Sequence, residues 1–258
     1  MNYKAWAEWY DVFYSTAPPD DIDFYVSLAR ESGGPVLEMG VGTGRIAIPT
    51  ASEGIDVIGV DLNEPMLRRA RQKIDAAGPL PGDIELVQAD MRRLALGGRT
   101  FPLVTIPART LLLATTPEDQ AAALRAAARH VAPGGRLAFN VFAPDPEMLT
   151  DTSDEPFEMG EAVNPETGRR CVLSAVNRFD TTAQTNHGLQ IVEELDDDGA
   201  VVRSVTLDVL VRYLQLDEAL ALAEQAGLAV TDVFGDFHRS PLDDDSEEMI
   251  FICEKSAG

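Results

Sequence analysis

The chain is poor in the residues that build disulfide frameworks, metal centres and basic surfaces. Its 258 residues include only two cysteines, Cys171 and Cys253, and three histidines, and no CxxC spacing occurs. We therefore expect neither a disulfide nor a metal site. Lysine and arginine total 21 against 43 acidic residues, and the formal net charge of −22 disfavours nucleic acids and anionic membranes as partners.

Long hydrophobic runs are also absent. No apolar run approaches the roughly 20 residues that span a bilayer. The first segment, MNYKAWAEWYDVFY, is too polar for the core of a signal peptide. We therefore expect a cytoplasmic protein. With 45% hydrophobic residues the chain can still bury a sizeable core, either in one large α/β domain or in two small ones.

The segment from residue 35 to about 142 alternates short apolar runs with longer amphipathic stretches, which is typical of βα units on a parallel sheet. One helix should begin after Asn63 and end at Gly78. Another should begin at a capping box of Thr116 and Asp119 and end before Pro133. The expected strands are GPVLEM, GIDVIGVD, DIELVQAD, FPLVTI and GRLAFNVFAP.

The pattern changes near residue 150. DTSDEPFEMGEAVNPETG is polar and rich in turn residues, and three successive strands are expected after it. We interpret this region as an antiparallel insertion, followed by a helix and two final strands that flank the acidic loop LDDDSEE, which is most simply solvated. The expected organisation is an N-terminal lid (1–34), an α/β core (35–150 and 214–258) and the insertion (151–213). The three insertion strands are CVLSAVNRFD, HGLQIVEEL and AVVRSVTLDVLVRYL.

The glycine-rich turn VLEMGVGTGRIAIP, residues 36–49, admits two ligands. As Gly42-x-Gly44-x-x-Ala47 it matches the dinucleotide pattern, in which a helix N-terminus faces a pyrophosphate. As E-x-G-x-G-x-G it begins at Glu38. Asp61, about 20 residues further on, fits both patterns because either ligand offers ribose hydroxyls to an acid.

Three further features favour a sulfonium nucleoside. Glu38 lies on the first strand, where a carboxylate suits a cationic amino-acid group better than a pyrophosphate. Asp90 and Met91 follow the third strand, where they can bracket an adenine ring. Pro133-Gly134-Gly135 precedes the fifth strand. In this order the motifs resemble those of class I S-adenosylmethionine-dependent methyltransferases. The resemblance implies a Rossmann-like α/β fold, a seven-stranded mostly parallel sheet with helices on both faces and an antiparallel β insertion after strand five.

The resemblance also implies residue roles and S-adenosylmethionine as the cofactor. Asp61 would hold the ribose hydroxyls, and Gly40 and Gly42 would let the methionine portion lie on bare backbone. Leu62 and Met66 are candidates for the ribose and adenine walls, although Met66 suits the core equally well. The full expected cofactor set is Tyr14, Glu38, Gly40, Gly42, Gly44, Arg45, Asp61, Leu62, Met66, Asp90, Met91 and Pro107.

The flanks resemble a narrower group. Tyr10-Asp11-Val12-Phe13-Tyr14 is similar to the Y-D-x-x-Y lid of bacterial small-molecule methyltransferases, including sugar-amine N-methyltransferases of secondary metabolism. Tyr14 would close over the sulfonium and Tyr10 would orient the acceptor; the alternative for both is an aromatic staple in an N-terminal helix. The segment PART, residues 107–110, matches no acceptor motif of a named subgroup. By location, the expected acceptor residues are Tyr10, Arg109, Asn140, Phe142, Arg212 and Arg239.

The histidines bear on whether a general base is available. His130 should be structural, because an imidazolium in the last turn of a helix favours the dipole, and His187 should lie on a polar surface connection. His238, in GDFHRSP, is the one that could face the acceptor and take a proton from a hydroxyl, although a plain loop role is the alternative. Tyr14 and His238 are therefore the expected catalytic residues.

The expected function is methyl transfer to N or O of a small molecule, by in-line displacement driven mainly by orientation. An NAD-dependent oxidoreductase is the first alternative, but no Tyr-x-x-x-Lys pair is present. A nucleic-acid or protein methyltransferase would carry an NPPY-like motif where this chain has IPART. A non-catalytic S-adenosylmethionine-binding protein stays open. The insertion could also pair two subunits in a homodimer.

Overall fold

The computed structural model describes residues 3–15, 19–150 and 154–255. Two helices, α1 (Tyr3–Tyr14) and α2 (Asp20–Ser32), precede the first strand. The α/β core then runs β1 (Val36–Met39), α3 (Ala47–Ser52), β2 (Val57–Asp61), α4 (Glu64–Ala77), β3 (Ile84–Gln88), η1 (Met91–Arg93), β4 (Phe101–Ile106), η2 (Thr110–Leu113), α5 (Pro117–His130), β5 (Val131–Phe142) and α6 (Pro146–Thr150).

The insertion consists of β6 (Phe157–Val163), β7 (Arg170–Asp180), β8 (Thr185–Leu195) and β9 (Val201–Arg212). The chain returns to the core through α7 (Leu216–Gln225), β10 (Leu228–Phe234) and β11 (Glu248–Lys255). None of the helices in the described ranges is long and apolar enough to cross a membrane.

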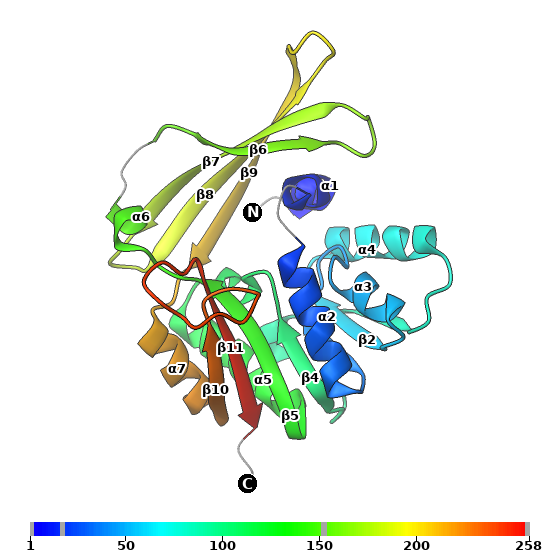
Figure 1. The fold of residues 1–258 in the computed structure, drawn as a ribbon, viewed down its shortest axis with the longest axis vertical. Coiled ribbons are helices and arrows are strands. Elements are labelled where there is room, and N and C mark those ends of the chain that lie inside the picture. The colour runs from blue at the N-terminus through cyan, green and yellow to red at the C-terminus, as the bar shows by residue number, and fades with distance from the viewer. Residues whose placement is uncertain (1–2, 16–18, 151–153, 256–258) are drawn as a thin grey trace.

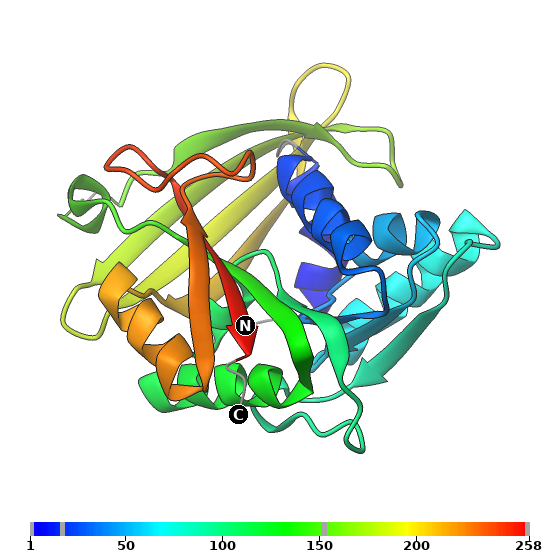
Figure 2. The same cartoon turned by 60° about the horizontal axis from the view of Figure 1, so that its bottom comes forward.

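The core sheet confirms the expected Rossmann-like architecture. Its seven strands are ordered β10-β11-β5-β4-β1-β2-β3. Strands β5, β4, β1, β2 and β3 run parallel, and β11 is antiparallel to both β5 and β10. One face packs on α5 and α7 around residues such as Leu37, Phe139 and Phe251. The other packs on α2, α3 and α4 (Figure 2).

Local signals explain the core helices. Thr116 caps α5 by accepting a hydrogen bond from the backbone N–H of Asp119 at 3.2 Å, and Pro117 occupies the first position. Helix α4 begins after Asn63 and ends at Gly78, which has a positive φ of 74°. The carboxylate of Asp119 does not complete a capping box, because it pairs with Arg92 instead.

Two expected boundaries are wrong. Strand β5 starts at Val131 and so includes the Pro133-Gly134-Gly135 segment expected to separate helix and strand, since β4 pairs with β5 from Phe101 and Val131 onward. Strand β6 lies in the stretch expected to be a polar connection. Exposed glutamates interrupt its apolar alternation, and pairing with β7 stabilises it as an edge strand.

The second sheet, β6-β7-β8-β9, is antiparallel throughout and lies above the carboxyl ends of the core strands (Figure 1). Helix α1 packs against its inner face, where Trp6, Trp9 and Phe13 meet Leu173 and Val192. The N-terminal helix therefore lies between the insertion and the core (Figure 1).

Candidate functional site

A cavity of about 1060 Å³ lies where the two sheets and α1 meet. The glycine turn after β1, the end of β2 and the segment after β4 form its core side, and the inner faces of β6 to β9 form its opposite side. Helix α1 contributes Trp6, Tyr10 and Tyr14. This position matches the rule that open α/β sheets bind ligands beyond the carboxyl ends of their strands.

The three glycines of the turn have different structural roles. Gly40 (φ 87°) and Gly42 (φ 55°) line the cavity in backbone conformations that other residues rarely adopt. A Cβ on Gly40 would lie 2.3 Å from a methyl of Thr110. Gly44 does not line the cavity and instead packs close to Ile48 and Ala70. The turn thus presents bare backbone to a ligand at two positions and serves helix packing at the third.

Asp61 lies at the carboxyl end of β2 and lines the same cavity. Its Oδ2 accepts a hydrogen bond from the Gly42 N–H at 2.9 Å, and its Oδ1 accepts one from the Asn63 N–H at 2.8 Å. Burial raises the pKa of Asp61, and these backbone bonds oppose that shift. Met66 borders the cavity beside Gly42, whereas Leu62 is exposed and lies outside the lining.

Glu38 and Arg45 lie behind the turn and do not line the cavity. Glu38 is 3% exposed on β1, and burial raises its pKa to about 8. Arg45 pairs with Asp21 through its two terminal guanidinium nitrogens and lies 5.0 Å from the ring centroid of Tyr14. In this structure Arg45 therefore holds the aromatic wall in place.

Asp90 and Met91, the two residues expected to contact adenine, also lie outside the cavity lining. Asp90 caps η1 and binds the guanidinium of Arg92, which lowers the pKa of Asp90. Neither Asp90, Met91 nor Pro107 lines the cavity. The carboxylate expected to face an exocyclic amine is thus occupied by an arginine from its own turn.

The segment after β4 carries local backbone strain. Ala108 and Arg109 both have positive φ, 53° and 58°, which is unusual for residues with a side chain. Both line the cavity. The Arg109 Nε donates to Glu248 Oε1 at 2.7 Å, and its guanidinium lies 5.7 Å from the ring centroid of Phe142. This segment projects a paired arginine into the cavity.

Asn140 hydrogen-bonds to Glu248, the partner of Arg109. It is 1% exposed and donates from Nδ2 to Glu248 Oε2 at 2.9 Å, while its Oδ1 accepts from the hydroxyl of Tyr25 at 2.8 Å. Burial raises the pKa of Glu248, which Arg109 and Asn140 counteract. Of the expected acceptor residues, Tyr10, Arg109 and Phe142 line the cavity, and Asn140 lies in the layer beneath.

Two other expected acceptor residues lie elsewhere. Arg212 is 5% exposed and bonded to Gln120, Gln184 and Glu218, so it joins the insertion to α5 and α7. Arg239 pairs with Glu31 at the outer surface. Arg212 ends β9 and Arg239 lies in the loop between β10 and β11, and neither side chain lines the cavity.

The expectation that His238 faces the acceptor is not met by the structure. Its exposed side chain lines a separate shallow groove beside α2, with Nε2 3.6 Å from Asp20. His130 is buried and its ring is held between two backbone groups, with Nε2 3.2 Å from the Leu96 nitrogen and Nδ1 2.7 Å from the Ala126 carbonyl oxygen. His187 lies within β8, 3.0 Å from Asp208, and not in a connection.

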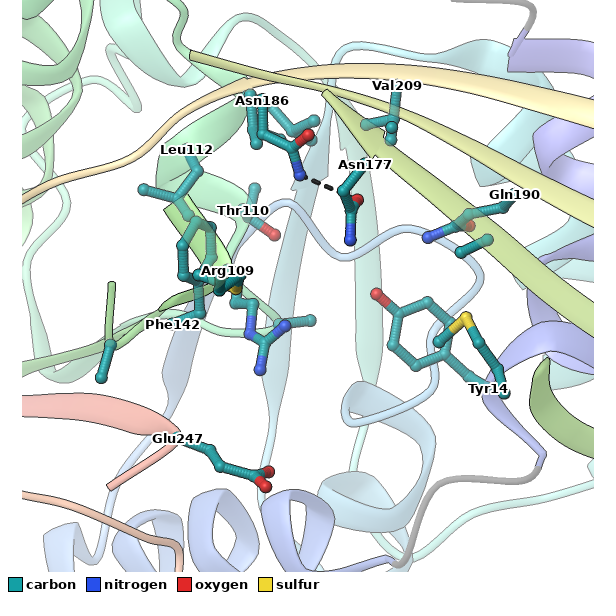
Figure 3. A pocket seen from close by; sticks show the side chains of 18 of the residues that line it. Tyr14, Arg109, Thr110, Leu112, Phe142, Asn177, Asn186, Gln190, Val209 and Glu247 are labelled. Atoms are coloured by element: carbon teal, nitrogen blue, oxygen red, sulfur yellow. Dashed lines mark hydrogen bonds between the residues drawn. The ribbon is translucent and has the colours of Figure 1, made fainter. Parts of the chain in front are cut away.

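Sequence reasoning missed two groups of lining residues. The first group is acidic. The loop LDDDSEE, which the sequence analysis interpreted as solvated, contributes carboxylates to the cavity, and the segment after β5 contributes further carboxylates. Amide side chains on the inner face of the insertion form the second group, and Figure 3 shows them opposite Tyr14. The only sequence signal for the amides was their inward register within the strands. The carboxylates are those of Asp145, Glu147, Asp244, Asp245 and Glu247. The amides are those of Asn177, Asn186 and Gln190.

Comparison with known proteins agrees with this architecture. The profile of a family described as a methyltransferase domain matches residues 36–135, from β1 to the start of β5. The cypemycin N-terminal methyltransferase of a Streptomyces species is 29% identical to this chain over 252 residues, which cover 96% of this chain and 95% of that protein.

Two solved structures extend the comparison. The CcbJ methyltransferase from Streptomyces caelestis is 28% identical, has a TM-score of 0.77 and matches 93% of this chain and 98% of its own. An S-adenosylmethionine-dependent methyltransferase from Clostridium acetobutylicum shares the fold over 100% of both chains, with a TM-score of 0.78 at 16% identity. These matches decide against the oxidoreductase alternative. The motif order, the fold and these relatives identify the chain as a class I S-adenosylmethionine-dependent methyltransferase.

Proposed function

We propose that this enzyme transfers the methyl group to an amine nitrogen of a small molecule. The observation that carries the proposal is the charge around the cavity. Five acidic residues line it beside Asp61, and within the described ranges Arg109 is the one basic side chain among the lining residues. Arg109 is itself neutralised by Glu248. The resulting negative electrostatic potential attracts cations, and an amine is a cationic ammonium group at neutral pH.

The same residues disfavour a hydroxyl acceptor that needs a histidine base. No histidine lines the cavity among the described residues, and His238 faces a different groove. A carboxylate such as Glu247, which Figure 3 shows at the cavity edge, is available to accept the proton that an ammonium must lose. The relative named as an N-terminal methyltransferase also supports nitrogen as the target.

The cavity fits the cofactor. Bare backbone at Gly40 and Gly42 leaves room for the amino-acid portion, and Asp61 offers a carboxylate to ribose hydroxyls. S-adenosylmethionine, when bound, would supply a methyl group on a sulfonium sulfur; transfer to the amine nitrogen would form an N–C bond, break the C–S bond and leave adenosylhomocysteine as the thioether product. Tyr14 and Tyr10 would then close the cavity above the turn and exclude water. Orientation of this kind is worth roughly 7–11 kcal/mol in well-aligned systems.

Glu38 and Arg45 would act on the cofactor from behind the turn. The pKa of Glu38 is raised by burial, and a nearby ammonium would favour its charged form. Arg45 would position Tyr14. Asp90 would accept from an adenine amine only after Arg92 releases its carboxylate.

The test is a matched set of acceptors. The purified enzyme with S-adenosylmethionine is offered primary amines and the corresponding alcohols, and adenosylhomocysteine is quantified by mass spectrometry. We expect product from amines and little from alcohols. Asp61→Ala, in which cofactor binding should be weakened, serves as the control. Turnover of the alcohols with no turnover of the amines would contradict the proposal.

We also propose a homodimer formed through the outer face of the insertion. Val163, Val202 and Leu210 are 61%, 46% and 44% exposed on its strands, and a second copy would cover them. Light scattering at working concentrations tests this, and a clean monomer would refute it. A cytoplasmic location is part of the proposal as well, supported by two buried free thiols, Cys171 and Cys253.

A further inference from the structure

The two sides of the cavity differ in charge. Every charged side chain of the described lining comes from the core: Asp61 ends β2, Arg109 follows β4, and the other acidic residues lie after β5 and between β10 and β11. Strands β6 to β9 contribute no charged side chain to the lining among the described residues. In Figure 3 Glu247 lies at the edge opposite Asn186 and Val209 of the insertion. An acceptor whose ammonium group is attracted to the core side therefore places the rest of its body against an uncharged surface.

Strand β6 adds two large apolar side chains to this uncharged surface. Phe157 and Met159 line the cavity and are 48% and 44% exposed. Phe157 pairs with Ala175, which also lines the cavity, so Phe157 lies on the inner face of the sheet. Further along the same face, Leu173 and Val192 are fully buried against α1. The chain thus covers one part of this apolar face and leaves Phe157 and Met159 open to a ligand, as is typical of small-molecule sites.

Met159 is the extra residue of a β-bulge. The pairing of β6 with β7 shifts between Glu158 and Gly160, so Met159 has no partner residue on β7. Gly160 has a φ of 131°, in the range that favours glycine, although a Cβ there would meet nothing within 4 Å. The glycine therefore serves the backbone of the bulge and does not relieve crowding. Bulges commonly redirect side chains beside active sites, and this one holds Met159 in the cavity lining together with Phe157.

The cavity has room for an acceptor beside the cofactor. Its volume of about 1060 Å³ lies at the upper end of the range of roughly 300–1,000 Å³ that small-molecule sites occupy. The cofactor would take the core side, against Gly40, Gly42 and Asp61, which leaves the side of the insertion to the acceptor. A thioether side chain such as that of Met159 adapts to apolar groups of irregular shape and makes favourable contacts with aromatic rings.

We propose that Phe157 and Met159 determine acceptor specificity by binding an uncharged hydrocarbon group on the part of the acceptor remote from the reacting nitrogen. This inference rests on the proposed amine methylation. The acidic core side attracts the ammonium group, and the hydrocarbon group covers the two exposed side chains of β6. A hydroxyl in the same place would lose water without a good replacement, because phenylalanine offers no hydrogen bond and a thioether is only a weak acceptor. The enzyme therefore selects amphiphilic amines.

The experiment measures binding to the enzyme saturated with adenosylhomocysteine, by calorimetry. The probes are 2-phenylethylamine, 4-phenylbutylamine and 6-phenylhexylamine, each compared with the amino alcohol in which a hydroxyl replaces the phenyl ring. We expect the best phenylalkylamine to bind at least about 10-fold more tightly than its amino alcohol, the effect of burying one apolar group. Its heat-capacity change on binding should also be more negative, which marks apolar burial directly.

Variants assign the effect to the two side chains. Phe157→Ser and Met159→Ser should each reduce the preference for the phenyl group about 4-fold, the effect of about one buried methylene, and the double variant should reduce it at least about 10-fold. Affinity for adenosylhomocysteine should stay unchanged in all three. Phe157→Leu keeps an apolar contact and should retain most of the preference. Val201→Ser is the matched control, because Val201 is an exposed apolar residue of the same sheet that does not line the cavity.

The outcomes distinguish this inference from the proposed function. Amino alcohols that bind as tightly as the phenylalkylamines, or a preference for the phenyl group that survives the double variant, would overturn the specificity proposal and leave amine methylation standing. Phenylalkanols of the same length, if they bound as tightly as the phenylalkylamines, would count against the amine and support the role of Phe157 and Met159. Failure of all the phenyl compounds to bind would overturn the specificity proposal.

Discussion

The link between the N-terminal helix and the glycine turn yields a quantitative prediction. Asp11 on α1 accepts hydrogen bonds from Thr43 Oγ1 and from Lys73 Nζ on α4, both at 2.7 Å. Thr43 is fully buried and lies between Gly42 and Gly44. Asp11 therefore ties the helix that carries Tyr10 and Tyr14 to the backbone that borders the cavity.

Thr43→Val removes the hydroxyl with little change in volume, and Asp11 keeps Lys73 as a partner. A hydrogen bond to a charged group is worth about 1.5–3 kcal/mol, and the 20% exposure of the Asp11 side chain places this one toward the lower end. A loss of about 1.5 kcal/mol raises the undocked population of α1 roughly 10-fold. Thr43→Ser retains the hydroxyl and should behave like the wild type.

Hydrogen exchange of the α1 amides measures this docking directly, because local opening free energies set the exchange rates. We expect α1 to exchange about 10-fold faster in Thr43→Val, with α5 unchanged as an internal reference. Equal exchange in the wild type and Thr43→Val would refute the reasoning, as would an equal acceleration in Thr43→Ser.

Three further predictions concern single residues. Asp61→Ala should weaken adenosylhomocysteine binding about 10- to 100-fold in calorimetry through lost charged hydrogen bonds; an unchanged dissociation constant in a folded variant would assign the ribose to another acid. His238→Ala should turn over close to the wild-type rate across the pH range, since His238 lines a separate groove, and a large loss would return it to the site. Folding raises the pKa of Glu38 to about 8, so the ionised carboxylate destabilises the folded protein. This destabilisation is absent below about pH 4.5, the pKa of Glu38 in the unfolded chain, and it grows as the pH rises to about 8. Glu38→Gln should accordingly gain thermal stability relative to the wild type over that range, and a constant difference with pH would show that Glu38 titrates normally.

The sequence alone was sufficient for the class of fold and for the position of the glycine turn that borders the cavity. These follow from patterns that can be read along the chain: alternating strands and helices, glycines at alternate positions, and an acid at the end of the second strand about 20 residues after the glycines. Gly40, Gly42, Asp61 and Met66, four of the residues expected to bind the cofactor, line the cavity, and helices α4 and α5 begin after the expected Asn63 and Thr116.

The positions of the side chains on the acceptor side of the cavity depend on contacts between segments that lie far apart in the chain. Whether an arginine or a histidine faces a cavity is decided by its partners, and Glu218 and Glu31 hold Arg212 and Arg239 away from it. The acidic loop reaches the cavity because β11 pairs with β5, and the inward amides face it because the insertion folds back over the core. Local sequence patterns carry no information on such long-range pairings, so only the tertiary structure could assign these side chains.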